Sequence, residues 1–383
     1  MRFKTQVFKM RVYNIDVNIT QKCTFACDYC FATCEEKTLK DFYDPSVLKR
    51  FIFKLLESKW FKDNYDFLSI GLWGGEPTTR PEIVVDLINT FMFDNVKFFL
   101  FTNGYNINDD IWQTLVDTKE FRVDGQPKVN TQISYDGRPI HDIYRRTKGN
   151  LLTSAAVRNQ IKRFDEESIP FVIKSTVTAD TFKYMYWAYR DIKELYKKLK
   201  NTPINYFPTI DHYENSPGLM LEVYKKELEH SLIKIANEEQ FIKGGQFFFK
   251  WFNNNRALCA AGYNAVAIDV DGTIYTCHGC LYDDKQTKFK HRISRIGLDT
   301  VVNDLEAMHK EFAVNIMDDK ECKKCDVNFC LRCNHAKYSK SKKQGYLDKW
   351  RDFTNQPNLC EFYKINSIVT RSMKEMKEIT RRK

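Results

Sequence analysis

Three cysteines near the N-terminus have a spacing that suits a metal cluster. Cys23, Cys27 and Cys30 are separated by three and then two residues. Three thiolates in one tight turn can bind three irons of a [4Fe-4S] cluster, which leaves the fourth iron without a protein ligand. An open iron can bind a small molecule and pass it one electron, whereas a cluster with four protein thiolates only carries electrons. The alternatives at this point are a zinc site or no metal site.

The residues around this triple fit a site at the end of a parallel sheet. Residues 13–20 alternate like a strand and lead into the cysteines, and residues 67–73 form a second candidate strand. Two glycines and a glutamate follow at 74–76. Glycines let the backbone approach a ligand closely, and a carboxylate suits an ammonium group. The alternative is an ordinary turn from strand to helix, with Pro77 near the first helical position.

Together these features resemble the radical S-adenosylmethionine (SAM) enzymes. In that family the open iron chelates the amino and carboxylate groups of SAM. One electron then splits SAM, and the resulting 5′-deoxyadenosyl radical abstracts hydrogen from the substrate. Tyr29 matches the aromatic residue before the last cysteine of the family motif. The resemblance implies that Gly74, Gly75 and Glu76, which match its GGEP motif, meet the methionine amino group of SAM.

Polar residues also follow the later candidate strands. The resemblance makes Ser134 and Asp136 candidates for the ribose side of SAM and Arg145 a candidate for its carboxylate, since a guanidinium binds a carboxylate with two hydrogen bonds. The alternatives are a plain turn at Asp136 and a surface position for Arg145. Lys174, Thr176 and Thr178 occupy alternate positions of the candidate strand and are expected to project into the same interior.

Strand and helix patterns alternate from Val12 to about Asp211, which predicts an α/β fold with a parallel sheet. The resemblance implies a partial (β/α)6 barrel, similar to a TIM barrel, with a C-terminal iron-sulfur domain over its open side. The candidate strands are 13–20, 67–73, 96–102, 129–135, 170–178 and 203–209, and the candidate helices are 45–58, 81–92, 109–117, 151–164 and 180–199.

A second group of cysteines lies in the C-terminal third. Its spacing is Cys-x12-Gly-x4-Cys, then Cys-x2-Cys-x4-Cys-x2-Cys, then one further cysteine. This pattern resembles the SPASM domain, the auxiliary-cluster module of radical SAM maturases, although its four-cysteine part is shorter by one residue in two places. The cysteines are Cys259, Cys277, Cys322, Cys325, Cys330, Cys333 and Cys360.

Cys280 is additional to that pattern. With it the C-terminal cysteines number eight, enough to close two auxiliary [4Fe-4S] clusters, so three clusters are expected in all. The resemblance assigns Cys259, Cys277, Cys280 and Cys333 to the first auxiliary cluster, and Cys322, Cys325, Cys330 and Cys360 to the second. The alternatives are an unligated Cys280 beside an open iron, and zinc in place of iron. Cys34 is expected to be a buried apolar residue.

Length and composition fit a cytoplasmic enzyme of several domains. The chain has 383 residues and a formal charge of +10, and neither a signal peptide nor a membrane helix is evident. Clustered cysteines favour metal ligands in a reducing compartment over disulfides. The expected units are a radical SAM partial barrel at 1–211, a bridging helical region at 212–258, a SPASM domain at 259–365 and a basic C-terminal helix at 366–383.

The sequence therefore predicts a radical SAM/SPASM enzyme that oxidatively modifies a peptide or protein side chain, by a thioether or carbon-carbon cross-link or by formylglycine formation. The alternative is a radical SAM dehydrogenase acting on a small molecule such as an aminocyclitol. Expected partners are the substrate and an electron donor such as flavodoxin or ferredoxin; no membrane or nucleic acid is expected. With only a short segment before Val12, any leader peptide is expected to bind elsewhere. No catalytic base is evident.

Overall fold

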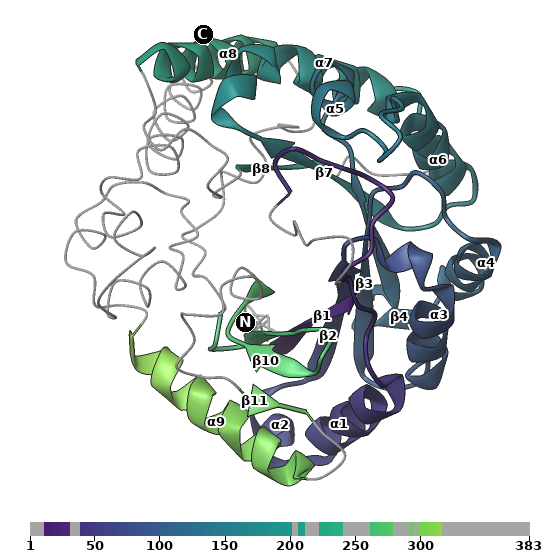
Figure 1. Ribbon diagram of the computed structural model, residues 1–383, viewed down its shortest axis with the longest axis vertical. Coiled ribbons are helices and arrows are strands. Elements are labelled where there is room, and N and C mark those ends of the chain that lie inside the picture. The colour runs from purple at the N-terminus through teal and green to yellow at the C-terminus, as the bar shows by residue number, and fades with distance from the viewer. Residues whose placement is uncertain are drawn as a thin grey trace, which may run out of the picture.

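In the part of the chain that the structure describes, nine strands form one curved sheet with helices on its outer side (Figure 1). The computed structural model describes residues 11–30, 39–200, 206–210, 222–239, 261–278, 291–293 and 297–315. Within these residues the strand order is β11-β10-β9-β1-β2-β3-β6-β7-β8, and the strands from β1 to β8 pair in parallel. They are β1 (Val12–Thr20), β2 (Phe67–Gly74), β3 (Val96–Thr102), β6 (Val129–Ser134), β7 (Phe171–Val177) and β8 (Tyr206–Ile210).

Helices follow most of the parallel strands and cover the convex side of the sheet. The first helix begins at Pro45, where Asp44 accepts a hydrogen bond from the Ser46 backbone N–H at 3.0 Å and so caps the helix. The helices are α1 (Pro45–Glu57), α2 (Lys59–Asn64), α3 (Pro81–Thr90), α4 (Asp109–Thr118), α5 (Arg138–Tyr144), α6 (Ser154–Glu166), α7 (Met185–Tyr196), α8 (Glu222–Glu239) and α9 (Leu298–Asn315), with short 3-10 turns at Pro77–Thr79 and Ala179–Tyr184.

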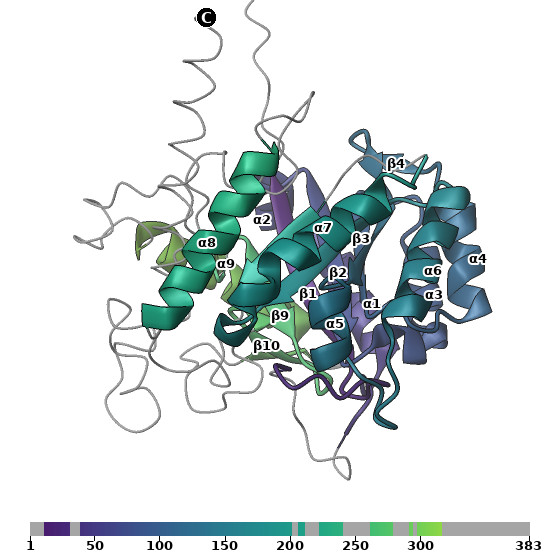
Figure 2. The same ribbon diagram turned by 90° about the horizontal axis from the view of Figure 1, so that it is seen from above.

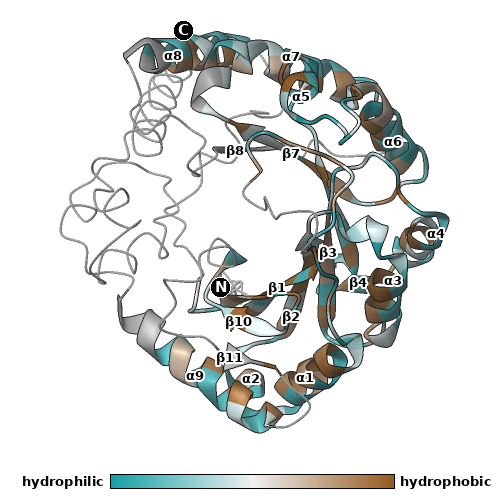
Figure 3. Cartoon of the chain, in the orientation of Figure 1, coloured by the Kyte–Doolittle hydropathy of each residue, from teal (hydrophilic) through white to brown (hydrophobic). Residues whose placement is uncertain are grey.

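Strand β1 shows how the sequence assigns its two faces. Tyr13, Ile15, Val17 and Ile19 are buried in the core between the sheet and the helices, because alternate side chains of a strand point to opposite faces. The residues between them are polar and point to the concave side. Figure 3 shows the same division, with hydrophobic colour along the strands and hydrophilic colour on the outer turns of α6 and α8. The concave face of β1 therefore carries the polar side chains that can take part in chemistry. The convex face carries the apolar side chains that pack against the helices.

A C-terminal hairpin extends the sheet beyond β1. It consists of β9 (Ala265–Ile268) and β10 (Thr273–Tyr275), with β11 (His291–Arg292) paired to β10. The turn ends at Gly272, which has a φ of +83° and whose N–H donates to the Asp269 carbonyl at 2.8 Å. Because β9 pairs in parallel with β1, the C-terminal third of the sequence shares one sheet with the N-terminal part.

The sheet is open. In the described part of the chain β11 and β8 are its two outer strands and are not paired with each other. Figure 2 shows the strands running side by side, with α3, α4 and α6 on one flank and α8 and α9 on the other. The architecture is therefore an α/β partial barrel, and the prediction of this fold class is confirmed.

The predicted elements agree with the structure for all six parallel strands and, within a few residues at their ends, for the five candidate helices. The elements that were not predicted include the short helices α2 and α5, the hairpin β4 (Arg122–Val123) and β5 (Gln126–Pro127), and the 18-residue helix α9. The predicted C-terminal helix, Cys34, Cys259, Cys280 and the cysteines from 322 onward lie outside the described residues. The domain boundaries remain predictions.

None of the helices among the described residues is both long enough and apolar enough to cross a membrane.

Candidate functional site

The cysteine loop follows β1 directly and is held from two sides. On one side the Gln21 N–H donates to the Lys40 carbonyl at 2.8 Å. On the other side Phe25 forms an antiparallel bridge with Thr147, and the Ala26 N–H donates to the Arg146 carbonyl at 2.9 Å. The loop is thus fixed at the carboxyl end of the sheet, where barrel enzymes place their chemistry.

The three thiols of this loop lie close enough to interact electrostatically. Cys23, Cys27 and Cys30 are half-buried and are not joined in disulfide bonds. Burial raises the pKa of Cys23 and of Cys27 to about 12, and the neighbouring thiols add to the effect in both cases. Such thiols favour a cation that replaces the proton and compensates the thiolate charge.

The donor set of the loop is compatible with an iron-sulfur cluster. No group of three or more His, Cys, Asp or Glu in the described residues surrounds a position for one ion. In a [4Fe-4S] cluster each thiolate binds a different iron, so its ligands need not converge on one point. Cys23, Cys27 and Cys30 are the residues that would hold the cluster.

The glycines at the end of β2 pack directly against the start of this loop. A Cβ atom on Gly74 would lie 2.2 Å from the Thr20 carbonyl oxygen, and one on Gly75 would lie 2.3 Å from the Lys22 carbonyl oxygen. The Gly75 N–H donates to the Thr20 carbonyl at 2.7 Å. Only glycine allows this close approach, so the two segments of the predicted SAM site are brought together.

Glu76 is buried and connects the ends of β2 and β3. Its Oε1 accepts hydrogen bonds from the Thr78 hydroxyl at 2.7 Å and the Thr102 hydroxyl at 2.8 Å, and its Oε2 accepts from the Asn103 N–H at 2.6 Å. Burial raises the pKa of Glu76, and these donors oppose the rise. The carboxylate is therefore fixed in position next to Cys23, whose pKa it also raises.

Asp136 organises the other side of the cysteine loop. Its carboxylate accepts hydrogen bonds from the Tyr29 hydroxyl, from Arg145 Nε at 2.7 Å and from the Thr176 N–H at 2.8 Å. Burial opposes the charge of Arg145, but Asp136 outweighs that cost and raises the pKa of Arg145 above its ordinary value. The charge of Arg145 in turn acts to lower the pKa of Cys27. Three of the predicted SAM-site residues, Tyr29, Asp136 and Arg145, thus form one cluster beside the thiols.

Ser134 and Lys174 lie on neighbouring strands at the same level of the sheet. They are paired residues of β6 and β7, and Ser134 is partly exposed toward the concave side. Burial lowers the pKa of Lys174, while the charge of Asp16 acts in the opposite direction. Thr176 accepts a hydrogen bond from Arg145 at 3.3 Å, whereas Thr178 is buried at the start of the following 3-10 turn.

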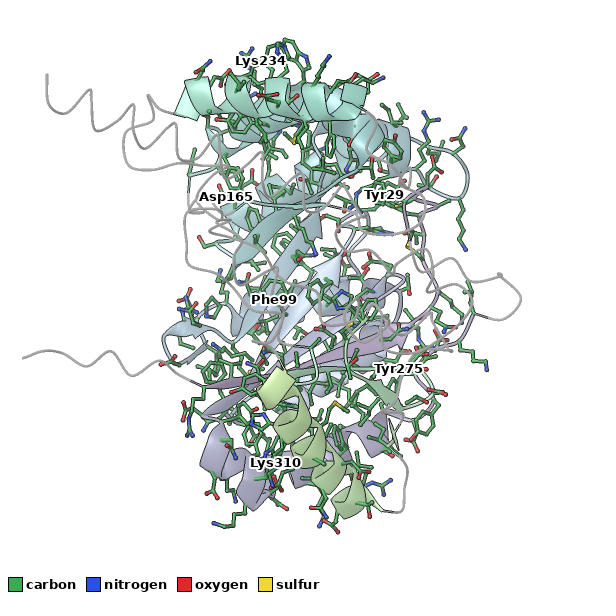
Figure 4. All side chains as sticks on the ribbon, turned by 90° about the vertical axis from the view of Figure 1, so that its left-hand side faces the viewer. Tyr29, Phe99, Asp165, Lys234, Tyr275 and Lys310 are labelled. Atoms are coloured by element: carbon green, nitrogen blue, oxygen red, sulfur yellow. The ribbon has the colours of Figure 1, made fainter. Side chains whose placement is uncertain are left out.

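Cys277 reaches the concave face from the C-terminal hairpin. It packs against a small cluster of Trp73, Ala267 and Tyr275. The next residue, His278, lies with Nδ1 3.2 Å from an Asp16 carboxylate oxygen on β1. Figure 4 labels Tyr29 and Tyr275 on the same side of the molecule, with Asp165 on the opposite side. Cys277 is the only cysteine of the second group within the described residues.

Sequence reasoning missed two parts of this site. Asp16 is one of the polar residues on β1 whose alternation with apolar residues could have indicated an inward position. Asn103 donates its N–H to Glu76 and its side-chain amide to the Thr24 hydroxyl at 3.1 Å. The position of Asn103 directly after β3 could have indicated that it belongs to the site.

Comparisons with known proteins agree with this geometry. Residues 17–150 match the model of the radical SAM superfamily. No curated protein matches the sequence significantly.

Solved structures share the fold. The structure of anSMEcpe with bound AdoMet (SAM) has a TM-score of 0.63 and 18% identity, covering 96% of this chain and 98% of that chain. That of Streptococcus suis SuiB bound to S-adenosylmethionine has a TM-score of 0.53 and 16% identity, covering 83% of this chain and 71% of that one. Residues 17–150 of this chain, including the cysteine loop and the end of β2, therefore form a radical SAM domain.

Proposed function

We propose that this protein is a radical SAM/SPASM maturase that oxidatively modifies a side chain of a peptide or protein. The observation that carries the proposal is the close packing of the Gly74-Gly75 backbone against Thr20 and Lys22, directly before the loop that carries Cys23, Cys27 and Cys30. Three [4Fe-4S] clusters, SAM and a cytoplasmic setting are parts of the same proposal.

Cys23, Cys27 and Cys30 would hold the first cluster, which would supply the single electron that cleaves SAM and so the radical chemistry that removes one hydrogen atom from the substrate. The chain's own residues have three tasks. Gly74, Gly75 and Glu76 would hold the methionine end of SAM, and Ser134, Asp136 and Arg145 would hold its ribose and carboxylate. The polar concave face between β1 and β7 would accept the substrate side chain.

The position of Cys277 favours an auxiliary cluster near the substrate. After hydrogen abstraction the substrate must lose one further electron and one proton to complete a two-electron oxidation. A cluster bound at Cys277 would lie against Trp73, on the same concave face as the SAM site. SAM would then be consumed rather than regenerated.

The class of substrate is proposed from two relatives in fold. One is anSMEcpe with bound AdoMet and Cp18Cys peptide, and the other is SuiB bound to the precursor peptide SuiA. Both bind a peptide in a chain of this architecture. The competing proposal is a dehydrogenase acting on a small molecule such as an aminocyclitol, which would use the same concave face.

The experiment uses the anaerobically reconstituted enzyme with peptides encoded by neighbouring reading frames. The proposal expects a peptide product lighter by about two hydrogen atoms for a cross-link, with one 5′-deoxyadenosine per product. Formylglycine formation on a cysteine or serine peptide would be seen by reaction of the new aldehyde with a hydrazide. Oxidation of an aminocyclitol, with no change in any peptide, would support the competing proposal instead.

A further inference from the structure

The surface beside the cysteine loop carries apolar side chains that packing does not explain. Leu151 and Leu152 are 61% and 63% exposed, and Ile143 is 43% exposed. Single exposed apolar residues are common on protein surfaces, whereas neighbouring ones often mark a site of contact with another molecule. These three residues, called here the leucine patch, belong to the end of α5 and the loop before α6.

The leucine patch belongs to the segment 143–152, which is hydrogen-bonded to the cysteine loop. Within that segment Thr147 bridges Phe25, and the Lys148 N–H donates to the Thr24 carbonyl at 3.1 Å. The Leu151 carbonyl accepts from the Thr147 N–H at 3.1 Å, which ties the patch to the same turn. A molecule seated on the patch would therefore lie next to the loop that binds the first cluster.

The cysteine loop is itself accessible on this side. Thr24 and Ala26 are exposed, although Phe25 between them is buried. Electron transfer falls steeply with distance, so a protein donor must bring its redox group close to this loop. Figure 2 shows the loop and the segment before α6 together at one edge of the molecule, with the convex helices on another side.

Charge favours an acidic partner. The segment from Arg138 to Leu152 holds four arginines and lysines, of which Arg145 is buried against Asp136 and Arg138 pairs with Asp191. The other two are Arg146 and Lys148, and the one acidic residue of the segment is Asp142. Asp142 is engaged internally, because its carboxylate accepts from the Thr153 and Ser154 N–H groups. Arg146 and Lys148 thus flank the leucine patch, and an apolar centre with a basic rim suits an acidic protein. Asp28 is an exposed acidic residue on the cysteine loop.

We propose that the leucine patch with Arg146 and Lys148 is the docking surface for an acidic one-electron carrier protein. The inference rests on the proposed function, since it assigns the place where the electron enters. The reduced carrier gives up one electron and is oxidised by one electron, and the first cluster site receives that electron.

The test compares two reductants on the same holoenzyme. The probes are reduced flavodoxin, an acidic one-electron protein donor, and dithionite, which needs no docking surface. Variants Leu151→Ser/Leu152→Ser and Lys148→Glu remove the apolar centre and reverse one rim charge. Controls are Phe93→Ser and Lys226→Glu, which change an exposed apolar residue and an exposed lysine away from this segment.

The expected result has two parts. With flavodoxin, 5′-deoxyadenosine formation falls about tenfold or more in both docking variants and stays unchanged in both controls. With dithionite, all variants equal the wild type. The Kd of oxidised flavodoxin for the holoenzyme, measured by biolayer interferometry, rises by a similar factor in the docking variants only.

Two results would overturn the inference. One is an unchanged flavodoxin Kd and rate in the docking variants, and the other is an equal loss with dithionite. If the wild type forms no 5′-deoxyadenosine with dithionite, the proposed function fails, and the flavodoxin Kd of the variants still decides the docking surface by itself.

Discussion

Arg145 Nε lies 2.7 Å from Asp136 Oδ2, in an ion pair whose two side chains are 10% and 0% exposed. The Tyr29 hydroxyl donates to the same carboxylate oxygen, so the ion pair joins the last turn of the cysteine loop to the end of β6. A second carboxylate, Asp191, makes the same kinds of contact with Tyr135 and Arg158, at 2.6 and 2.8 Å. It lies on α7 and provides a matched control.

We expect Asp136→Asn to destabilise the protein by about 3 kcal/mol, because the Arg145 charge stays buried without its partner. The same substitution should raise the SAM Kd and reduce iron retention, since Tyr29 and Arg145 lose their common anchor. Asp191→Asn should also cost stability but leave SAM binding and iron content near wild type. Thermal unfolding, calorimetry with SAM and iron analysis separate the two. Equal SAM binding in both variants would contradict the role given to Asp136.

Gly75→Ala should prevent correct packing of β2 against the cysteine loop. A Cβ there would lie 2.3 Å from a backbone oxygen, which no rotamer change can relieve. We expect a loss of about four irons per chain, as for a missing cluster. Gly149→Ala is the control, because its nearest atom lies 3.8 Å away and it belongs to an exposed loop. Full iron content in Gly75→Ala would show that the close approach is not required.

Glu76→Gln should weaken SAM binding while leaving the cluster in place. Glutamine keeps the shape of the side chain but removes the negative charge that would meet the methionine ammonium. Thr102→Val is the control, because it removes one donor to Glu76 without changing the charge. Calorimetry should show SAM Kd rising by about tenfold or more in Glu76→Gln only. A normal Kd there would mean that Glu76 only joins the ends of β2 and β3.

The cysteine thiols of the metal-free protein should react slowly with iodoacetamide at pH 8. Burial raises the pKa of Cys23 and Cys27 from 9.0 to about 12, which lowers the fraction of reactive thiolate. The labelling rate should rise with pH toward that pKa and increase on unfolding in urea. Peptide mass spectrometry at several pH values measures it. Fast labelling of both residues at pH 8 in the folded protein would refute this.

The stability of the protein should decrease as pH falls from about 6.5 to 4. Burial lowers the pKa of His141 to about 4, so the unfolded chain binds a proton in this range that the folded chain does not. The contribution of His141 to the free energy of unfolding is fully present above the pKa that this histidine has in the unfolded chain. Its loss lowers the free energy of unfolding by up to about 3 kcal/mol. His141→Gln should flatten the profile, whereas replacement of the exposed His230 should not. A parallel profile in both variants would contradict the assignment.

The parallel strands could be predicted from the sequence because their two faces differ in polarity, as in β1. The proximity of the cysteine loop to Gly74 and Gly75 could also be predicted, since neighbouring parallel strands end at the same edge of a sheet. The sequence did not reveal that β9 pairs with β1, because hairpin residues carry no signal for a distant partner. The contact of Asp16 with His278 was missed for the same reason, since 262 residues separate them.

The central claim is that Cys23, Cys27 and Cys30 hold a cluster that cleaves SAM. The measurement is iron and sulfide content, together with 5′-deoxyadenosine formed from SAM and dithionite, in the wild type and in the triple variant with alanine at these positions. The account predicts about twelve irons in the wild type, about eight in the variant, and 5′-deoxyadenosine only in the wild type. Zinc in place of iron, or a variant that keeps all its iron and still cleaves SAM, would contradict it.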